Sequence, residues 1–178
     1  MEVLKEAYFN TKYQGSSTAC ILTLTCDIVH AVNVGDSGFV VIREGGIVYK
    51  SEIQQKRFNC PFQLGNDDKS DDPSVAQEIM VPVKTGDVIV MASDGLWDNV
   101  HDYELEKLVR DRLVDLREMG TFSKMLARKI AEYAQKNSET VPFSYLNDGD
   151  ISAMGLGDIS QFAARASVLS PTLGAKSS

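Results

Sequence analysis

The stretch Asp87-Val-Ile-Val-Met-Ala-Ser-Asp-Gly-Leu-Trp-Asp-Asn-Val100 determines much of what this chain can form. Its apolar, β-branched run from Val88 to Ala92 predicts a buried strand that stops at Ser93. Asp94 therefore falls at the edge of a sheet, and Asp98 follows on the next turn. Carboxylates placed there are oxygen ligands suited to a hard divalent cation such as Mg²⁺ or Mn²⁺. Because Asp-Gly is also a common turn dipeptide, a plain turn stays open as the alternative.

The composition predicts a single globular domain. The chain has 178 residues, of which 43% are hydrophobic, so it can bury a sizeable core. The net charge is −7 and the pI about 4.8. Scattered, outnumbered lysines and arginines argue against a nucleic-acid-binding surface. No apolar run approaches membrane-spanning length. The first residues lack a signal or transit peptide and resemble the middle of a helix, so we expect a longer protein to precede them.

The three cysteines do not form a recognisable metal or disulfide framework. Cys20 and Cys26 lack zinc-type spacing and an accompanying histidine cluster, and Cys60 is isolated. Cys20 lies in an apolar run and is predicted to be a small core residue. This usage favours a reducing compartment.

Strand patterns dominate the first half of the chain, after a short amphipathic helix within 2–13. We predict strands at 19–26, 28–34, 39–43, 47–50, 79–83 and 87–92. Glu44-Gly45-Gly46 is a strong hairpin signal. The connections are too short for parallel crossovers, so the sheets are expected to be antiparallel and the fold class α+β.

Two amphipathic helices follow the strands. The first has an N-cap candidate in Asp102, and the second begins after Thr121. Their predicted core-facing positions are Leu105, Leu108, Val109, Leu113 and Leu116 in the first, and Phe122, Met125, Leu126, Ile130, Tyr133 and Ala134 in the second. We expect this helix pair, at 102–136, to pack on the outside of the sheets.

The acidic segment Asn66-Asp-Asp-Lys-Ser-Asp-Asp72 lies in an irregular region, 51–78. Its order of residues does not fit an EF-hand, and it lacks the glutamate that such a loop needs. A solvated loop is therefore the favoured interpretation, with calcium binding as the weaker one.

Three polar breaks carry the candidate chemistry: Gly15-Ser-Ser-Thr18, Gly35-Asp-Ser-Gly38 and Ser93-Asp-Gly-Leu-Trp-Asp98. The last two place Asp36 and Asp94 directly after apolar strands, which an antiparallel sheet can bring together. Two carboxylates in a small volume repel each other unless a proton or a cation lies between them. A divalent metal would also lower the pKa of a bound water and so generate a nucleophile at neutral pH.

These breaks, in this order, resemble the metal-dependent Ser/Thr protein phosphatases of type 2C. The resemblance rests on Gly15-Ser-Ser-Thr-Ala-Cys20, Val32-Asn-Val-Gly-Asp-Ser-Gly38 and Gly86–Val100, and covers residues 5–145. The segment Gln54–Leu64 resembles the mitochondrial and plastid branch that includes the yeast Ptc-seven-like enzymes.

The resemblance implies a fold, a cofactor and a substrate class. The fold would be an antiparallel β-sandwich flanked by helices (α-β-β-α), incomplete at its N-terminus. Asp94 would be a ligand of a dinuclear Mg²⁺ or Mn²⁺ centre, and Asp36 and Asp98 would join it in holding a third metal. The substrate would be phosphoserine or phosphothreonine in a phosphoprotein, and the protein would lie inside the cell, in a chloroplast or mitochondrion rather than the cytoplasm.

The chain departs from the family at both ends. The Asp-Gly-His-Gly-like turn and the phosphate-binding arginine would lie before Gly15, and His30 and His101 are not placed to substitute. Two late segments echo the family's final motif: Asp148-Gly-Asp-Ile-Ser152 and Gly157-Asp-Ile-Ser160. Asp150 and Asp158 are weak candidate ligands, because Gly149 and Gly157 occupy the positions of the family's metal-binding aspartate.

The expected organisation is a partial phosphatase domain at 1–147 and a divergent tail at 148–178, disordered and without strand-like alternation. This chain has too few candidate ligands to hold two metal ions. We therefore expect the chain alone to be weakly active or inactive. A truncated pseudophosphatase that binds phosphoproteins or other partners without hydrolysis is the alternative function.

Overall fold

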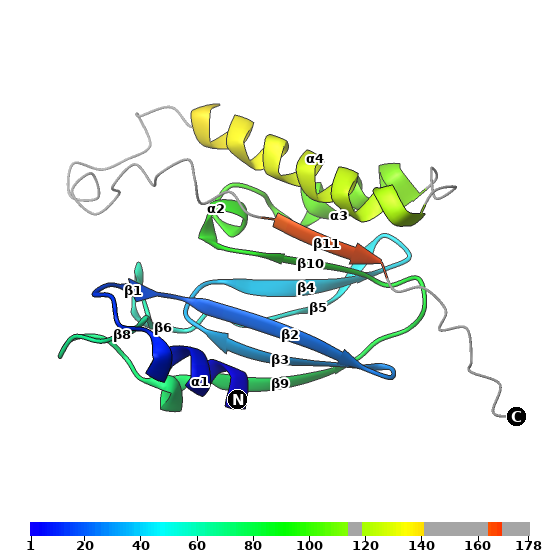
Figure 1. Ribbon diagram of the computed structural model, residues 1–178. Helices are drawn as coiled ribbons and strands as arrows, with labels where there is room; N and C mark the ends of the chain where they lie inside the picture. Colours follow the sequence, from blue (N-terminus) through cyan, green and yellow to red (C-terminus); the bar gives the residue numbers. More distant parts are fainter. Residues whose placement is uncertain (114–118, 141–163, 169–178) are drawn as a thin grey trace, which may run out of the picture.

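The computed structural model describes residues 1–113, 119–140 and 164–168 of the chain. Within these residues, two antiparallel sheets pack face to face, and helices cover the outer face of one of them (Figure 1). The predicted α+β sandwich is confirmed.

The elements follow in a simple order. The helical elements are α1 (Glu2–Asn10), the 3₁₀ turn η1 (Pro73–Val75), α2 (Asp94–Trp97), α3 (Asp102–Leu113) and α4 (Met119–Thr140). The strands are β1 (Ser16–Ser17), β2 (Ala19–Thr25), β3 (Ile28–Val34), β4 (Gly38–Arg43), β5 (Gly46–Lys50), β6 (Gln55–Arg57), β7 (Cys60–Pro61), β8 (Leu64–Gly65), β9 (Gln77–Pro82), β10 (Val88–Ala92) and β11 (Ala164–Val168).

The strands form two main sheets. One has the order β2-β3-β9 and the other β11-β10-β4-β5, and every pairing of these strands is antiparallel. Two-stranded pairs β1-β8 and β6-β7 complete the irregular region. The predicted hairpin is confirmed: Glu44 and Gly45 both have positive φ, +52° and +82°, as a tight two-residue turn requires. The strands predicted from residue 19 to residue 92 are all present, with ends shifted by one or two residues.

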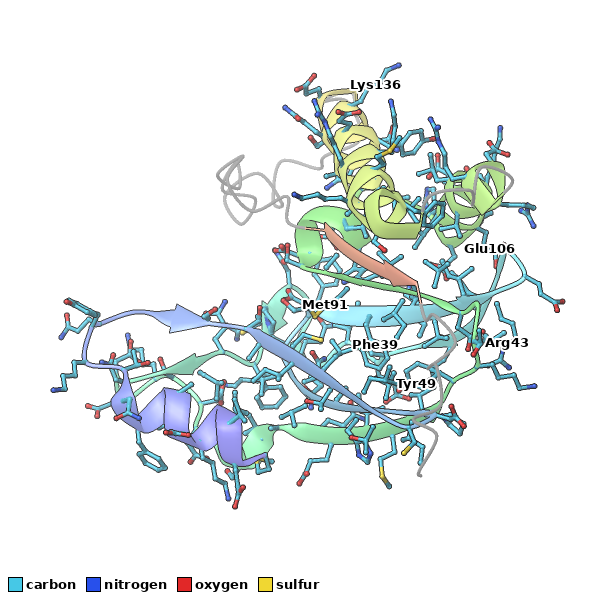
Figure 2. All side chains as sticks on the ribbon, turned by 45° about the vertical axis from the view of Figure 1, so that its right-hand side comes forward. Phe39, Arg43, Tyr49, Met91, Glu106 and Lys136 are labelled. Atoms are coloured by element: carbon cyan, nitrogen blue, oxygen red, sulfur yellow. The ribbon has the colours of Figure 1, made fainter. Side chains whose placement is uncertain are left out.

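The space between the sheets is filled by alternate residues of the strands. Phe39, Val41 and Ile89 come from the four-stranded sheet, and Val29, Ala31, Ile79 and Val81 come from the three-stranded sheet. Phe39 is fully buried and its ring lies 5.4 Å from that of Tyr49 (Figure 2). Cys20 packs at the margin of this core as predicted, and burial raises the pKa of its thiol to about 11.

The opposite face of the four-stranded sheet packs on α3 and α4. Val40, Ile42, Val88 and Val90 meet the helical residues Leu105, Val109, Phe122, Leu126, Ile130 and Ala134. The predicted apolar stripes are therefore core faces. Met125 is the exception: it is 57% exposed, because it lies to one side of the buried line formed at four-residue intervals from Phe122. Leu113 and Leu116 lie outside the residues whose side chains are described.

Both predicted helix starts need correction. α3 begins at Asp102, so Asp102 is its first residue rather than its cap. Instead, Glu104 accepts a hydrogen bond from the backbone N–H of His101, 2.9 Å away, which is one half of a capping box. Asp102 pairs with Lys50 across 2.6 Å. α4 begins at Met119, three residues before the start predicted after Thr121; the burial of its later turns allows a helix to extend beyond its apolar stripe.

A strand in the tail was not expected. β11 pairs along the whole of β10, from Val88 opposite Val168 to Ala92 opposite Ala164. Our prediction of a tail without strand structure is therefore wrong at 164–168. The segment Ala-Arg-Ala-Ser-Val has too few large apolar residues to show an alternation, and the unpaired edge of β10 accepts it through backbone hydrogen bonds. The rest of the tail, 141–163 and 169–178, lies outside the described residues.

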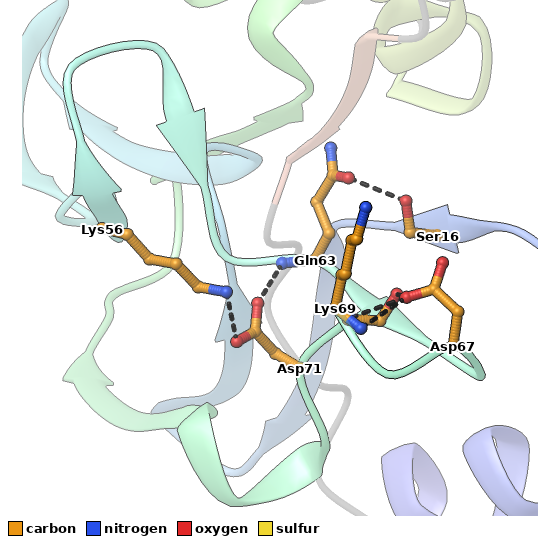
Figure 3. A network of polar contacts seen from close by, with 7 residues as sticks. Ser16, Lys56, Gln63, Asp67, Lys69 and Asp71 are labelled. Carbon is orange, nitrogen blue, oxygen red and sulfur yellow. Dashed lines mark hydrogen bonds and ion pairs between the residues drawn. The ribbon is translucent and has the colours of Figure 1, made fainter.

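The acidic loop is held by its own hydrogen bonds (Figure 3). Asp67 accepts from the backbone N–H groups of Lys69 and Ser70 and from the Ser70 hydroxyl, which lowers the pKa of its carboxyl. Asp71 pairs with Lys56 across 2.8 Å and accepts from the N–H of Gln63. These carboxylates stabilise the loop rather than converge on one point, which agrees with the predicted solvated loop.

In the part of the chain that the structure describes, no helix combines the length and the apolar character needed to cross a membrane.

Candidate metal site

Asp36 lies where the chain passes from one sheet to the other. β3 ends at Val34 and β4 begins at Gly38, so Gly35-Asp36-Ser37 is the connection between the three-stranded and four-stranded sheets. Gly35 has φ +90°, a conformation that favours glycine. A Cβ atom there would lie 2.5 Å from both the Phe62 carbonyl oxygen and Thr18 Cγ2. Close packing and backbone conformation together set the direction in which Asp36 leaves the sheet.

Asp94 is brought to the same edge by strand register. Gly38 at the start of β4 pairs with Ala92 at the end of β10. Asp36 lies two residues before this pair and Asp94 two residues after it, so both aspartates stand at one end of adjacent strands. The structure thus confirms that the two polar breaks converge, as predicted from the apolar runs beside them.

Asp98 joins them through the short helix α2. We predicted a simple turn after β10, whereas Asp94–Trp97 forms one helical turn and the Asp98 N–H donates to the Asp94 carbonyl across 2.9 Å. The turn places Asp94 and Asp98 on the same side. Trp97 is half-buried, and its indole N–H donates to the Ala92 carbonyl, 2.9 Å away, which fixes α2 against the end of β10.

The three carboxylates interact electrostatically. Burial and the charge of Asp94 raise the pKa of Asp36, against the opposing effect of hydrogen bonds from its own backbone N–H and that of Ser37. Asp98 lies at the surface, yet partial burial and the charges of Asp94 and Asp36 raise its pKa. The Asp94 charge therefore makes both Asp36 and Asp98 less acidic, and a bound cation would relieve this repulsion.

The first polar break reaches the same region. The hydroxyl oxygens of Thr18 and Ser37 lie 2.6 Å apart, in a hydrogen bond between the start of β2 and the Asp36 turn. No role was predicted for Thr18 from the sequence. Its position in the Gly-Ser-Ser-Thr motif could have indicated that it lies near the Asp36 turn. The Ser37 hydroxyl is thus held by a partner distant in sequence.

The donor set suits a hard cation but does not by itself enclose one. Carboxylate oxygens are the ligands that Mg²⁺ and Mn²⁺ prefer. However, no three His, Cys, Asp or Glu side chains of the described ranges are arranged as a ready-made metal site. Asp150 and Asp158 lie outside these ranges. His30 is exposed within β3, and the ring of His101 stacks on that of Tyr103. The residues present fit part of a metal site.

Comparison with known proteins identifies the class. The family model described as Protein phosphatase 2C matches residues 71–140. An Arabidopsis thaliana protein named "Probable protein phosphatase 2C 80" is 43% identical over 136 residues, which are 76% of this chain and 32% of that protein. The human "Protein phosphatase PTC7 homolog" is 41% identical over 135 residues, 68% of this chain and 42% of that protein.

Solved structures show the same fold. The photosystem II phosphatase PBCP aligns with a TM-score of 0.65 and 24% identity, over 93% of this chain and 67% of that one. The catalytic domain of the serine/threonine phosphatase PstP, solved with two manganese ions, aligns with a TM-score of 0.55 and 13% identity, over 94% of this chain and 66% of that one.

These relatives, together with the shared fold, define the family. The chain belongs to the type 2C protein phosphatase family. It spans about a third of the length of the curated Arabidopsis relatives that it matches.

Replacing Gly35 by alanine is expected to destabilise the fold and weaken cation binding together. The positive φ alone costs about 1–3 kcal/mol for a residue with a Cβ, and the contacts with Phe62 and Thr18 add to this. Gly86 is the matched control, since it has φ +91° but a Cβ added there would meet no atom within 4 Å. Thermal unfolding of Gly35→Ala and Gly86→Ala measures the cost of backbone strain, which both variants share. Mn²⁺ titration of the same variants measures the effect of displacing Asp36, which is expected only for Gly35→Ala. Equal effects of the two variants on Mn²⁺ affinity would contradict the assigned role of Gly35.

Proposed function

We propose that this chain acts in the metal-dependent hydrolysis of phosphoserine and phosphothreonine in proteins. The observation that carries the proposal is the convergence of Asp36, Asp94 and Asp98 from two segments of the chain at one edge of the sandwich. The family to which the chain belongs supports the reaction class, and phosphoproteins are the substrates that it implies.

The three aspartates would contribute part of the ligand set of a divalent cation, Mg²⁺ or Mn²⁺. Such a cation supplies a water nucleophile at neutral pH and stabilises the charge that develops on a transferring phosphoryl group. Asp94 is held by the Gly95 N–H, which donates to its Oδ1 across 2.7 Å, so one carboxylate oxygen is oriented before any ligand arrives. Asp36 and Asp98 keep negative charge at the edge where a cation would bind.

The 178 residues alone are expected to show little or no turnover, because the described residues contribute only these three carboxylates to the site. The measurement is phosphate release from a phosphothreonine peptide by the purified chain, with and without Mn²⁺, beside Asp94→Ala. We expect release no faster than that of Asp94→Ala. Robust Mn²⁺-dependent release that Asp94→Ala abolishes would show that a complete site assembles within these residues.

The second candidate function is binding of phosphoproteins without hydrolysis. The incomplete set of metal ligands among the described residues supports this candidate, because catalysis needs more ligands than binding does. It predicts that the chain binds the phosphothreonine peptide equally well with and without metal. Binding that requires Mn²⁺ would instead support the phosphatase site. The chloroplast or mitochondrial location implied by the resemblance stays a prediction.

A further inference from the structure

The turn that carries Asp94 and Asp98 is held from outside by α4. Asn137, near the end of this helix, donates from Nδ2 to the backbone carbonyl of Asn99 across 2.9 Å. The two residues are 38 positions apart, so this bond joins separate elements of the fold. Asn99 directly follows Asp98, so the bond acts on the backbone beside a candidate ligand.

The contact continues toward the candidate ligand Asp94. The side chain of Asn99 donates from Nδ2 to the Gly95 carbonyl, 3.0 Å away. The Gly95 N–H in turn donates to Asp94 Oδ1 across 2.7 Å. Asn137, Asn99 and Gly95 therefore link the side of α4 to one oxygen of the Asp94 carboxylate.

A second bond from the same face of α4 holds the other end of this segment. Tyr133 lies four residues before Asn137, one helical turn away. Its hydroxyl donates to Glu104 Oε1 across 2.6 Å, and Glu104 Oε2 accepts from the His101 N–H across 2.9 Å. The connection from α2 to α3 is thus fastened to α4 at Asn99 and, through Glu104, at His101.

The position of α4 is itself fixed by the core. Leu126, Ile130 and Ala134 are at most 1% exposed and pack on the four-stranded sheet, the sheet that contains β10. The helix and β10 thus share one core, and the turn at 94–99 follows β10 and is bonded to α4. Because the core fixes α4, this helix can hold the turn at 94–99 in one orientation when no cation is bound.

We propose that Asn137 is a positioning residue for the metal site, supported by Tyr133. Asn137 orients the 94–99 turn through Asn99, so that Asp94 and Asp98 face Asp36. This inference rests on the proposed function for the cation, but the orientation of the turn is a property of the metal-free chain. Outer groups that orient ligands typically change metal affinity by about 10–100-fold.

The test compares Asn137→Asp with Gln135→Glu in the full chain. Both variants add one negative charge near the end of α4, at part-buried Asn137 or exposed Gln135, but only the first removes the donor to Asn99. Asn137→Ala removes the donor without adding charge and serves if Asn137→Asp fails to fold. Mn²⁺ affinity by calorimetry and amide hydrogen exchange of Gly95 and Asn99 in the metal-free protein are measured for each.

We expect about tenfold weaker Mn²⁺ binding and about tenfold faster exchange at Gly95 and Asn99 in both Asn137 variants. Gln135→Glu is expected to match the unmodified chain in both measurements. Unchanged exchange at Gly95 and Asn99 overturns the positioning role, whatever the affinity. Faster exchange with unchanged Mn²⁺ affinity also overturns it. If the unmodified chain binds no Mn²⁺, the proposed function fails, and exchange alone decides whether Asn137 orients the turn.

Discussion

Asp94→Asn is expected to weaken Mn²⁺ binding by at least about 100-fold, which exceeds the usual effect of losing a group behind a ligand. Asparagine has the shape of aspartate and keeps one oxygen that can accept from the Gly95 N–H, so α2 is expected to retain its conformation. What the variant removes is the negative charge of Asp94, which helps to raise the pKa values of both Asp36 and Asp98. Isothermal titration with Mn²⁺ measures the loss directly.

Asp68→Asn is the matched control for this measurement. Asp68 is an exposed aspartate in the acidic loop, and its replacement makes the same change in net charge. Mn²⁺ affinity is expected to stay within about twofold of that of the unmodified chain, since a charge far from a site is largely screened at ordinary salt. An equal loss of affinity in both variants would place the cation on general surface charge or on the acidic loop and would remove the candidate site.

The placement of Asp36 and Asp94 could be predicted from the sequence because each follows a continuous apolar run. Such runs mark buried strands, and antiparallel pairing brings the end of one beside the start of the next. The structure adds the register, Gly38 opposite Ala92, that makes this convergence specific. The helix pair was also predictable, since Leu105, Val109, Leu126 and Ile130 recur at helical spacing and are buried.

Other features could not be predicted, because they depend on partners far apart in the chain. The bond from Asn137 to Asn99 leaves no periodic pattern, and both residues read as ordinary polar surface positions. β11 is short and rich in small residues, and it becomes a strand only because β10 offers an unpaired edge. The start of α4 at Met119 likewise lies before Phe122, the first residue of the apolar stripe, so the apolar pattern does not mark it.

Asp87→Asn is expected to lower the free energy of unfolding by about 2–3 kcal/mol. The Asp87 carboxylate is 1% exposed and accepts from Arg43 Nε and Nη2 across 2.9 and 2.8 Å, and from the Lys84 N–H across 2.8 Å. Breaking a fully buried pair costs about 3–5 kcal/mol, and the 30% exposure of Arg43 reduces this. The pair joins the end of β4 to the start of β10, so its loss loosens the sheet at the end opposite the candidate metal site.

The exposed pair of Lys50 and Asp102 provides the control. Its side chains are 40% and 54% exposed, and its atoms lie 2.6 Å apart. Asp102→Asn is expected to change stability by less than about 1 kcal/mol, as is usual for surface pairs. Urea unfolding of both variants at neutral pH makes the comparison. A loss in Asp87→Asn no larger than that in Asp102→Asn would show that burial adds nothing to the Arg43 pair.

The lowered pKa of Asp87 also predicts how the stability difference between the unmodified chain and Asp87→Asn changes with pH. Burial raises the pKa of Asp87, but hydrogen bonds from Arg43 and the Lys84 N–H outweigh burial and leave the pKa below its ordinary value of 3.8. A carboxyl with a lowered folded-state pKa stabilises the fold fully above its unfolded pKa, and this stabilisation is lost as the pH falls through the folded-state value. The unfolding free energies of the unmodified chain and Asp87→Asn should therefore differ most above about pH 4 and converge below it. A difference that stays constant down to about pH 2 would assign the effect of Asn to altered packing rather than to the charge of Asp87.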